Sequence, residues 1–217
     1  QVSAMSRPPL SVRDGFTLIE LLVVIAILAL TTMLLVGGIT RSIARAQTVQ
    51  CLSNIRQVGI ASRLYSMEMG GRLPDISHLR DAEGNSRSWS ITLRDFLGEG
   101  FLGRCPANRN SRATVSYAWN DMLTDPSGQG LRLHDVRHPS RTLQLGEHAD
   151  GYLSEHFHFR GRSGEARLSL NQFRNQVGVD RHGNGANYLF VDGHVATISV
   201  SVVESWLREP GIPFLNP

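Results

Sequence analysis

The sequence predicts an α+β protein in which a long N-terminal helix packs on a small antiparallel β-sheet head. Three stretches support this prediction: an apolar run at residues 21–36, an apolar stripe with helical spacing at 43–65, and an Asp-Gly pair between two β-rich runs near the C-terminus. The first half of the helix is apolar enough to span a membrane, and the second half is amphipathic. We expect four parts: a leader peptide at 1–15, a transmembrane helix at 16–39, its amphipathic extension at 40–69, and a globular head at 70–217.

The composition is that of an ordinary folded protein. Of the 217 residues, 41% are hydrophobic and 19% are charged, so the chain can bury a core. All 22 basic residues are Arg, and they are scattered rather than clustered with aromatic residues. The net charge of +3 is too small to indicate an acidic partner. We therefore expect no nucleic-acid partner.

The stretch from Gly15 to Gly38 is long enough to cross a bilayer as a helix. About 20 consecutive apolar residues cross a hydrocarbon core of roughly 30 Å. A soluble core helix would instead carry apolar residues on one face only. Glu20 lies just inside the beginning of the run. A carboxylate facing lipid costs about 3 kcal/mol or more at the centre of a span, so Glu20 requires a partner.

The residues Gly-Phe-Thr-Leu-Ile-Glu and the apolar run after them resemble the processing motif of type IV prepilins and of type II secretion pseudopilins. The resemblance implies that a prepilin peptidase cleaves between Gly15 and Phe16 and that Phe16 is then N-methylated. Glu20 would be the fifth residue of the mature chain. The amine of Phe16 in an incoming subunit would neutralise Glu20 of a neighbour, which makes burial of both charges tolerable.

The resemblance also implies a pilin-like fold, assembly with copies of itself and with other pilin-like subunits, and a single-pass location in a bacterial inner membrane with the head extracytoplasmic. Arginines flank the apolar run on both sides, so the positive-inside rule does not decide the orientation. An ordinary signal anchor with an unrelated Glu is one alternative. A second is a secretory signal peptide cleaved after Ala46, but the apolar run exceeds the roughly 7–15 residues of such peptides.

Residues 1–15 have the character of a leader: they are polar and lack apolar periodicity. The sequence does not begin with Met, and a start at Met5 would give a short basic leader.

After Gly38 the helical pattern resumes. One stripe of residues recurs every three or four positions: Ile43, Ala46, Val49, Leu52, Ile55, Val58, Ala61 and Tyr65. Gly70, Gly71 and Pro74 end the pattern. A helix from Phe16 to Met69 would be roughly 80 Å long at 1.5 Å per residue. Gly37 and Gly38 are its expected weak point.

Residues 70–135 contain many loop signals, a short helix predicted at 90–97 and a strand predicted at 115–120. The two cysteines are Cys51 on the helix and Cys105 in a Cys-Pro turn. They allow one disulfide between head and helix, which an extracytoplasmic location would permit. Two buried thiols are the alternative.

Residues 142–147 and 157–160 are predicted strands. Four residues in this part of the chain suggest a metal site: His148, Asp150, His156 and His158, with Glu155 beside them. Their spacing matches no known zinc signature. We therefore predict no metal and no cofactor.

The strongest pattern in the head is the hairpin predicted at residues 186–200. Asp192-Gly193 between apolar β-rich runs predicts a type I′ turn. This turn would pair Tyr188 with Thr197, Leu189 with Ala196, Phe190 with Val195, and Val191 with His194. Because both faces are largely apolar, we expect the hairpin at the centre of the head.

The hairpin also resembles a C-terminal module of prepilin-like proteins in which nine residues separate a His from Asp-Gly, here His182, Asp192 and Gly193. The stretch from Cys51 to Pro74 and the pair Cys105-Pro106 resemble the same group. The role of His182 is open: its ring would fix the loop or turn, or else act as a ligand or catalytic group. The last element predicted is a short helix from Glu204, stopped by Pro210 and followed by a tail.

No enzyme signature is present: we find no G-x-S-x-G, P-loop or H-E-x-x-H pattern. We expect a structural subunit, processed by prepilin peptidase and assembled into a filament through its N-terminal helix. A membrane-anchored binding module that does not polymerise is the alternative, and a membrane-tethered hydrolase is a third hypothesis. The sequence does not distinguish a long pilus from a short secretion pseudopilus.

Overall fold

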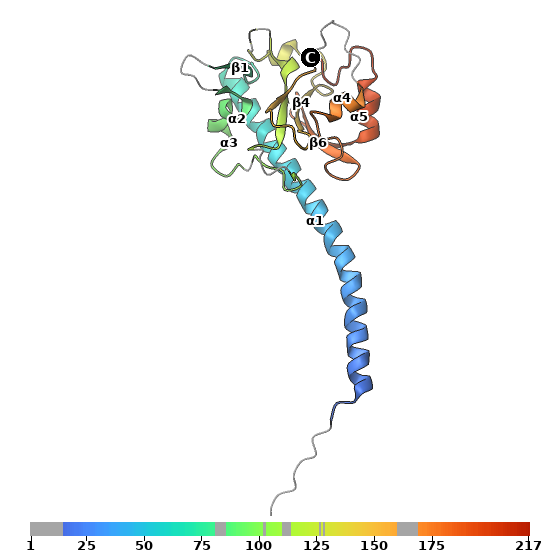
Figure 1. Ribbon diagram of the computed structural model, residues 1–217. Coiled ribbons are helices and arrows are strands. Elements are labelled where there is room, and N and C mark those ends of the chain that lie inside the picture. The colour runs from blue at the N-terminus through green and yellow to red at the C-terminus, as the bar shows by residue number, and fades with distance from the viewer. Residues whose placement is uncertain are drawn as a thin grey trace, which may run out of the picture. The chain divides into compact units, whose positions relative to one another are not determined.

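The computed structural model describes residues 15–80, 86–101, 103–109, 114–125, 127, 129–159 and 169–217. The predicted leader up to residue 14, the loop signals at 83–85, Pro126 and Gly128, and the strand end at Arg160 lie outside these residues. The chain divides into two compact units, residues 1–43 and 44–217. The α+β prediction is confirmed (Figure 1). The proposed four-part division of the chain stays a prediction.

Helix α1 (Leu18–Glu68) contributes to both units. It begins at a Thr17 cap and ends at two glycines in the left-handed region, Gly70 and Gly71, with φ of 62° and 84°. The Gly71 N–H donates to the Ser66 carbonyl at 2.7 Å, which satisfies one of the last helical carbonyls. Gly37 and Gly38, the expected weak point, lie within continuous helix.

In the first unit, α1 exposes its apolar side chains in every direction. All described residues from 15 to 43 are exposed, and Leu18 retains 82% of its accessible surface. Three threonines on this helix donate their hydroxyls to carbonyls one turn earlier: Thr31, Thr32 and Thr40. Their polar groups are therefore satisfied within the helix, as a helix in an apolar environment requires.

In the second unit, α1 buries one face against the sheet. The buried residues are Cys51, Asn54, Ile55, Val58, Gly59, Ala61, Ser62 and Ser66. The predicted stripe is therefore confirmed only from Ile55 onward, since Ile43 and Val49 remain exposed. Small side chains allow the close approach. A Cβ at Gly59 would lie 2.8 Å from Leu189 Cδ1.

The head contains a five-stranded sheet of order β5-β3-β4-β6-β7. The strands are β3 (Tyr117–Asn120), β4 (Leu143–Glu147), β5 (His156–Phe157), β6 (Gly185–Phe190) and β7 (Val195–Ser199). Neighbours pair antiparallel except β3 and β5, which are parallel, so the sheet is mixed rather than wholly antiparallel. The short strands β1 (Ser77–Arg80) and β2 (Ser86–Arg87) form a separate pair. All three predicted strands between 115 and 160 are present, each shorter than expected.

The sheet separates two apolar cores (Figure 1). One core contains the buried face of α1, Trp89, Leu93 and the side chains of Tyr117, Trp119 and Leu189. The other contains residues of the opposite sheet face with α4 (Leu170–Arg174), α5 (Val200–Leu207) and the C-terminal tail. Alternate residues of β3 and β6 enter different cores because side chains of a strand point to opposite faces.

The hairpin β6–β7 is present, but its predicted turn type and register are wrong. Tyr188 pairs with Ala196 and Leu189 with Val195, one residue away from the prediction. Phe190 and His194 close a three-residue loop, in which only Gly193 has positive φ, at 93°. A type I′ turn needs positive φ at both central residues, whereas a type I turn followed by a left-handed glycine needs one. β6 is fully buried and β7, at the sheet edge, is half-buried.

Two helix predictions need correction. The single helix expected at 90–97 is two turns of helix, α2 (Trp89–Thr92) and α3 (Arg94–Leu97), separated at the buried Leu93. The C-terminal helix is α5, which begins directly after β7 at Val200 rather than at Glu204. The tail beyond Pro210 packs on the head through Ile212, Phe214 and Leu215. The remaining helical turns are η1 (Asp121–Leu123) and η2 (Leu133–Asp135).

Candidate functional sites in the N-terminal segment and the head

The predicted processing residues lie in accessible, non-helical backbone just before α1. Phe16 retains 77% of its accessible surface. No heavy atom lies within 4 Å of the position that a Cβ on Gly15 would occupy. Exposed chain outside regular structure is where proteases cleave most readily. The arrangement is therefore compatible with cleavage between Gly15 and Phe16, although the cleavage itself stays a prediction.

Thr17 and Glu20 form a capping box at the beginning of α1. Glu20 Oε2 accepts the Thr17 N–H at 2.8 Å and the Thr17 hydroxyl at 2.6 Å, while Thr17 Oγ1 lies 3.4 Å from the Glu20 N–H. The box satisfies helix N–H groups that would otherwise lack partners. Within a single chain, Glu20 thus has a local partner that the sequence analysis missed. The pattern Thr-x-x-Glu before an apolar run is the signal that could have found it.

A second candidate site is a buried cluster in the head: Cys51, Cys105, Glu147 and His182, whose ligand atoms all lie within 4.8 Å of one another. Cys51 Sγ lies 2.7 Å from Glu147 Oε1, and His182 Nε2 lies 2.9 Å from the same oxygen. Cys105 Sγ lies 3.6 Å from His182 Nε2. This group, henceforth the thiol cluster, could hold a metal ion.

Each member of the thiol cluster comes from a different segment. Cys51 lies on the buried face of α1, and Cys105 follows an irregular segment after α3. Glu147 is the last residue of β4, and His182 precedes β6. Tertiary packing alone brings these segments together. Patterns in the sequence mark both cysteines and His182 separately, and none of them marks Glu147.

Both cysteines are free in the structure. Their sulfur atoms lie within 4.8 Å of each other, and the disulfide that the sequence allows stays a prediction. Burial raises the pKa of Cys51, and its hydrogen bonds with Cys105 and Glu147 raise it further. The hydrogen bond with Cys51 lowers the pKa of Cys105 to about 6 despite burial, and His182 contributes in the same direction.

The imidazole of His182 is almost fully buried within the cluster, with 2% of its side chain exposed. Burial by itself lowers the pKa of His182, but hydrogen bonds with Cys105 and Glu147 outweigh it and raise the pKa to about 9. The expectation that this ring bonds the hairpin loop or turn is not what the structure shows. Its ring contacts Thr48, Cys105 and Glu147 instead.

The other two residues of the His-to-Asp-Gly pattern lie at the opposite end of β6. Asp192 Oδ1 accepts the His194 N–H at 3.0 Å, and its carbonyl accepts Arg63 Nη2 at 2.9 Å. Asp192 and Gly193 thus shape the hairpin turn, whereas His182 belongs to the thiol cluster. Strand β6 spans most of the nine residues between His182 and Asp192.

The histidines that suggested a metal site have separate partners. His158 Nδ1 pairs with Asp121 Oδ2 at 2.9 Å, and His148 Nε2 lies 2.5 Å from the Val115 carbonyl. Asp150 pairs with Arg181 at 3.0 Å, and Glu155 accepts the Ser90 hydroxyl. His156 and His158 are neighbours, with ring centroids 4.4 Å apart. In the part of the chain that the structure describes, these residues do not form a ligand group.

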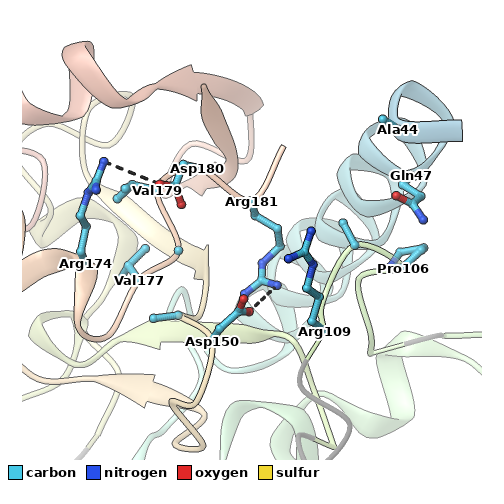
Figure 2. Close-up of a pocket in the computed structure, with 13 residues that line it drawn as sticks. Ala44, Gln47, Pro106, Arg109, Asp150, Arg174, Val177, Val179, Asp180 and Arg181 are labelled. Atoms are coloured by element: carbon cyan, nitrogen blue, oxygen red, sulfur yellow. Dashed lines mark ion pairs between the residues drawn. The ribbon is translucent and has the colours of Figure 1, made fainter. Parts of the chain in front are cut away.

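A polar pocket of about 810 Å³ opens in the head beside the thiol cluster (Figure 2). Arg181 points across the pocket to Asp150, and Arg109 lies next to this ion pair. Arg174 pairs with Asp180 at 3.7 Å on another wall. Pro106 and Arg181, the chain neighbours of Cys105 and His182, both line it. The pocket therefore brings solvent close to the cluster.

In the described residues, one helix is long and apolar enough to cross a membrane, namely α1. Its most apolar stretch lies near the N-terminus, and none of that stretch is buried in the protein. A soluble protein rarely exposes an apolar surface of this extent, because exposed apolar patches mark contacts with proteins or membranes. Membrane anchoring through a single span accounts for this surface.

The family described as the prokaryotic N-terminal methylation motif matches residues 10–36. No match was found among curated proteins or among solved structures. The methylation motif begins within the predicted leader and extends into the apolar part of α1. The motif, the long apolar helix that follows it and the small sheet head together fit a precursor of a type IV pilin-like or pseudopilin-like protein.

Proposed function

We propose that this chain is a structural subunit of a type IV pilus-like or type II secretion pseudopilus-like filament. Prepilin peptidase cleaves it between Gly15 and Phe16, Phe16 is N-methylated, and the mature helix then leaves the membrane to pack against other subunits. The observation that carries the proposal is the methylation motif on a helix whose apolar N-terminal part, up to residue 43, is entirely exposed. The subunit would have no enzymatic activity of its own.

The membrane placement follows from the same motif. We place residues 16–39 across the bacterial inner membrane, with the leader in the cytoplasm and the head outside it. In the filament, the exposed apolar side chains of α1 would contact the helices of neighbouring subunits instead of lipid. The free energy of transfer between these two environments is small, which allows a subunit to be stored in the membrane before assembly.

Glu20 would change partners during assembly. In the single chain its carboxylate binds the Thr17 hydroxyl and N–H. Cleavage at Gly15 creates a charged amine on Phe16, which in an incoming subunit would pair with Glu20 of a neighbour. A buried polar residue of this kind specifies register between helices at a cost in stability.

Processing is tested by co-expressing the full chain with a prepilin peptidase in a bacterium and measuring the intact mass. We expect the leader to be lost and one methyl group to be added. Gly15→Val should retain the leader because it replaces the glycine that directly precedes the proposed cleavage site. Gly37→Ala, on the same helix, is the control and should be processed normally. A wild-type chain that keeps its leader in the presence of active peptidase would contradict the proposal.

Assembly is tested with two substitutions of Glu20 that separate charge from capping. Glu20→Gln keeps an oxygen for the capping box but removes the charge, whereas Glu20→Ala removes both. Both variants should be cleaved and both should fail to enter sheared filaments or to cross-link as neighbours in the native membrane. Glu68→Gln, the control at the other end of α1, should assemble.

The alternative function, a membrane-anchored binding module, has one observation in its favour, the open arginine-containing pocket of the head (Figure 2). A module of this kind would not polymerise. Absence of the wild-type chain from the filament fraction and of cross-links between its copies, with the same result for Glu20→Gln, would favour it over a filament subunit.

A further inference from the structure

The thiol cluster contains side chains of the kinds that bind metal ions, and their ligand atoms lie close together. Two sulfur atoms, one imidazole nitrogen and one carboxylate oxygen approach one another from four segments, within 4.8 Å. All four side chains are buried or nearly so. Structural zinc sites use four such ligands in a tetrahedron, and they exclude water from the metal.

The hydrogen bonding of His182 prepares its Nε2 atom for this role. The Thr48 hydroxyl donates its one proton to the Ala44 carbonyl at 2.9 Å. Thr48 Oγ1 therefore accepts the hydrogen bond from His182 Nδ1, 3.2 Å away. With one ring proton held on Nδ1, Nε2 points at Cys105 and Glu147 and becomes the free ligand atom once its own proton is displaced. A metal-ligating histidine is almost always oriented by such a second partner.

We propose that Cys51, Cys105, Glu147 and His182 bind a structural Zn²⁺ ion in the head. Zinc–sulfur bonds of about 2.3 Å and zinc–nitrogen or zinc–oxygen bonds of about 2.0–2.2 Å place tetrahedral ligands roughly 3.3–3.8 Å apart. The Cys105–His182 distance of 3.6 Å already lies in this range. The two shorter distances to Glu147 need to open by less than about 1 Å to admit the ion.

Zinc binding would displace the protons that hold the metal-free cluster together. Without metal, the Cys51 thiol donates to Glu147, and His182 bonds the same carboxylate through a proton on Nε2. On binding, zinc would take the place of these two protons and of any proton on Cys105, and all of them would be released to solvent. The two positive charges of the ion would then offset the negative charges of the thiolates and the carboxylate, as a buried charged site requires.

Neighbouring groups complete an outer layer around the ligands. The Tyr117 hydroxyl lies 3.3 Å from Cys51 Sγ, where it can donate to a thiolate. The Asn187 N–H donates to the second oxygen of Glu147 at 2.9 Å. Partners of this kind orient ligands and tune metal affinity.

A disulfide between Cys51 and Cys105 fits this environment less well. It would remove the thiol proton that Glu147 accepts, and would leave a fully buried carboxylate with one donor fewer. An unsatisfied buried charge is costly. Zinc instead binds the carboxylate directly. The mixed set of thiolate, imidazole and carboxylate ligands also suits zinc better than the hard cations Ca²⁺ and Mg²⁺.

The site would link the helix to the sheet. One ion would join α1, the segment containing Cys105, the end of β4 and the start of β6. Zinc binding would thus stabilise the head, and it does not depend on whether the subunit polymerises.

The first test measures metal in the full chain, purified in detergent under reducing conditions with a tag that lacks histidine. We expect about one zinc ion per chain when metal content is measured by inductively coupled plasma mass spectrometry. Removal of zinc with a chelator should lower the melting temperature, and added zinc should restore it. Cobalt added to the metal-free protein should give the visible bands of a tetrahedral ion and thiolate charge-transfer bands.

Substitutions then assign the ligands. Cys51→Ala, Cys105→Ala and His182→Ala should each abolish stoichiometric zinc, whereas His194→Ala, on the hairpin turn, should retain it. If a ligand variant fails to fold, substitution of Thr48 is a milder test, because the Thr48 side chain contacts the site only through its hydrogen bond with His182. Thr48→Val should weaken zinc binding by roughly 10- to 100-fold, and Thr48→Ser should preserve it.

Three results would overturn the proposal: a wild-type chain that takes up no stoichiometric zinc after reduction, a cobalt complex without thiolate bands, or a native Cys51–Cys105 disulfide detected by mass. Glu20→Gln should keep its zinc. Failure of the zinc site is therefore distinguishable from failure of the filament proposal.

Discussion

Glu147 Oε1 lies 2.9 Å from His182 Nε2, with 0% and 2% of the two side chains exposed. The second carboxylate oxygen accepts the N–H of Asn187 at 2.9 Å. A single acidic residue at the end of β4 therefore binds both the segment before β6 and the strand itself. Because this pair is buried, its loss should affect stability far more than the loss of a surface ion pair.

Glu147→Ala should destabilise the head by about 3–5 kcal/mol, because it leaves His182 buried without its acidic partner. The measurement is urea unfolding of the full chain in detergent, monitored by tryptophan fluorescence. A chelator is present to exclude any contribution from metal. The matched control is Glu204→Ala, which breaks an exposed pair with Arg208 on α5. It should cost no more than about 0.5 kcal/mol. Equal losses in the two variants would contradict the buried role of Glu147.

Gly193→Ala should destabilise the β6–β7 hairpin by about 1–3 kcal/mol, because residue 193 has a φ of 93° that side chains with a Cβ rarely adopt. Gly193→Asn should cost less, since Asn tolerates the left-handed region better than other residues. Thermal unfolding gives the size of the effect, and amide exchange of residues 186–198 locates it. If Ala and Asn proved equally harmless, the turn geometry assigned to this hairpin would be wrong.

Asn120→Ala should loosen the C-terminal tail and cost about 2–3 kcal/mol, because a buried amide then leaves its partners unsatisfied. Asn120 Nδ2 donates to the carbonyls of Leu143 and Leu215, at 2.8 Å each. The expected result is a lower midpoint of urea unfolding together with faster removal of the tail by carboxypeptidase. Asn175→Ala, at an exposed position after α4, should change neither measurement. Resistance of the Asn120 variant to carboxypeptidase would show that the tail is anchored elsewhere.

Local patterns were sufficient for the main elements of the fold, but not for β1, β2 or α4. A continuous apolar run, a helical stripe and glycines at its end predicted α1, because helix length and termination depend on neighbouring residues. Alternating β-rich segments predicted β3, β4 and the β6–β7 hairpin for the same reason. The predicted register failed by one residue, since a three-residue and a two-residue loop share the Asp-Gly signal and differ only in backbone angles.

The thiol cluster could not be predicted from spacing, because its members are far apart in sequence and follow no zinc signature. A bridge between Cys51 and Cys105 was one of two open alternatives, and Glu147 was one residue of a predicted strand with nothing to mark it. His156 and His158, which suggested a metal site from the sequence, have other partners instead. Residues from four segments share a site only after the sheet has been assembled on the helix.

The sequence by itself thus determined the apolar helix, the methylation motif and the α+β character of this chain, because each depends on residues adjacent along the backbone. Only the tertiary structure decided that His182 faces Glu147 and two thiols rather than the hairpin turn. The physical reason is that packing of α1 against the sheet, through small residues such as Gly59, sets the distances between segments that the sequence leaves independent.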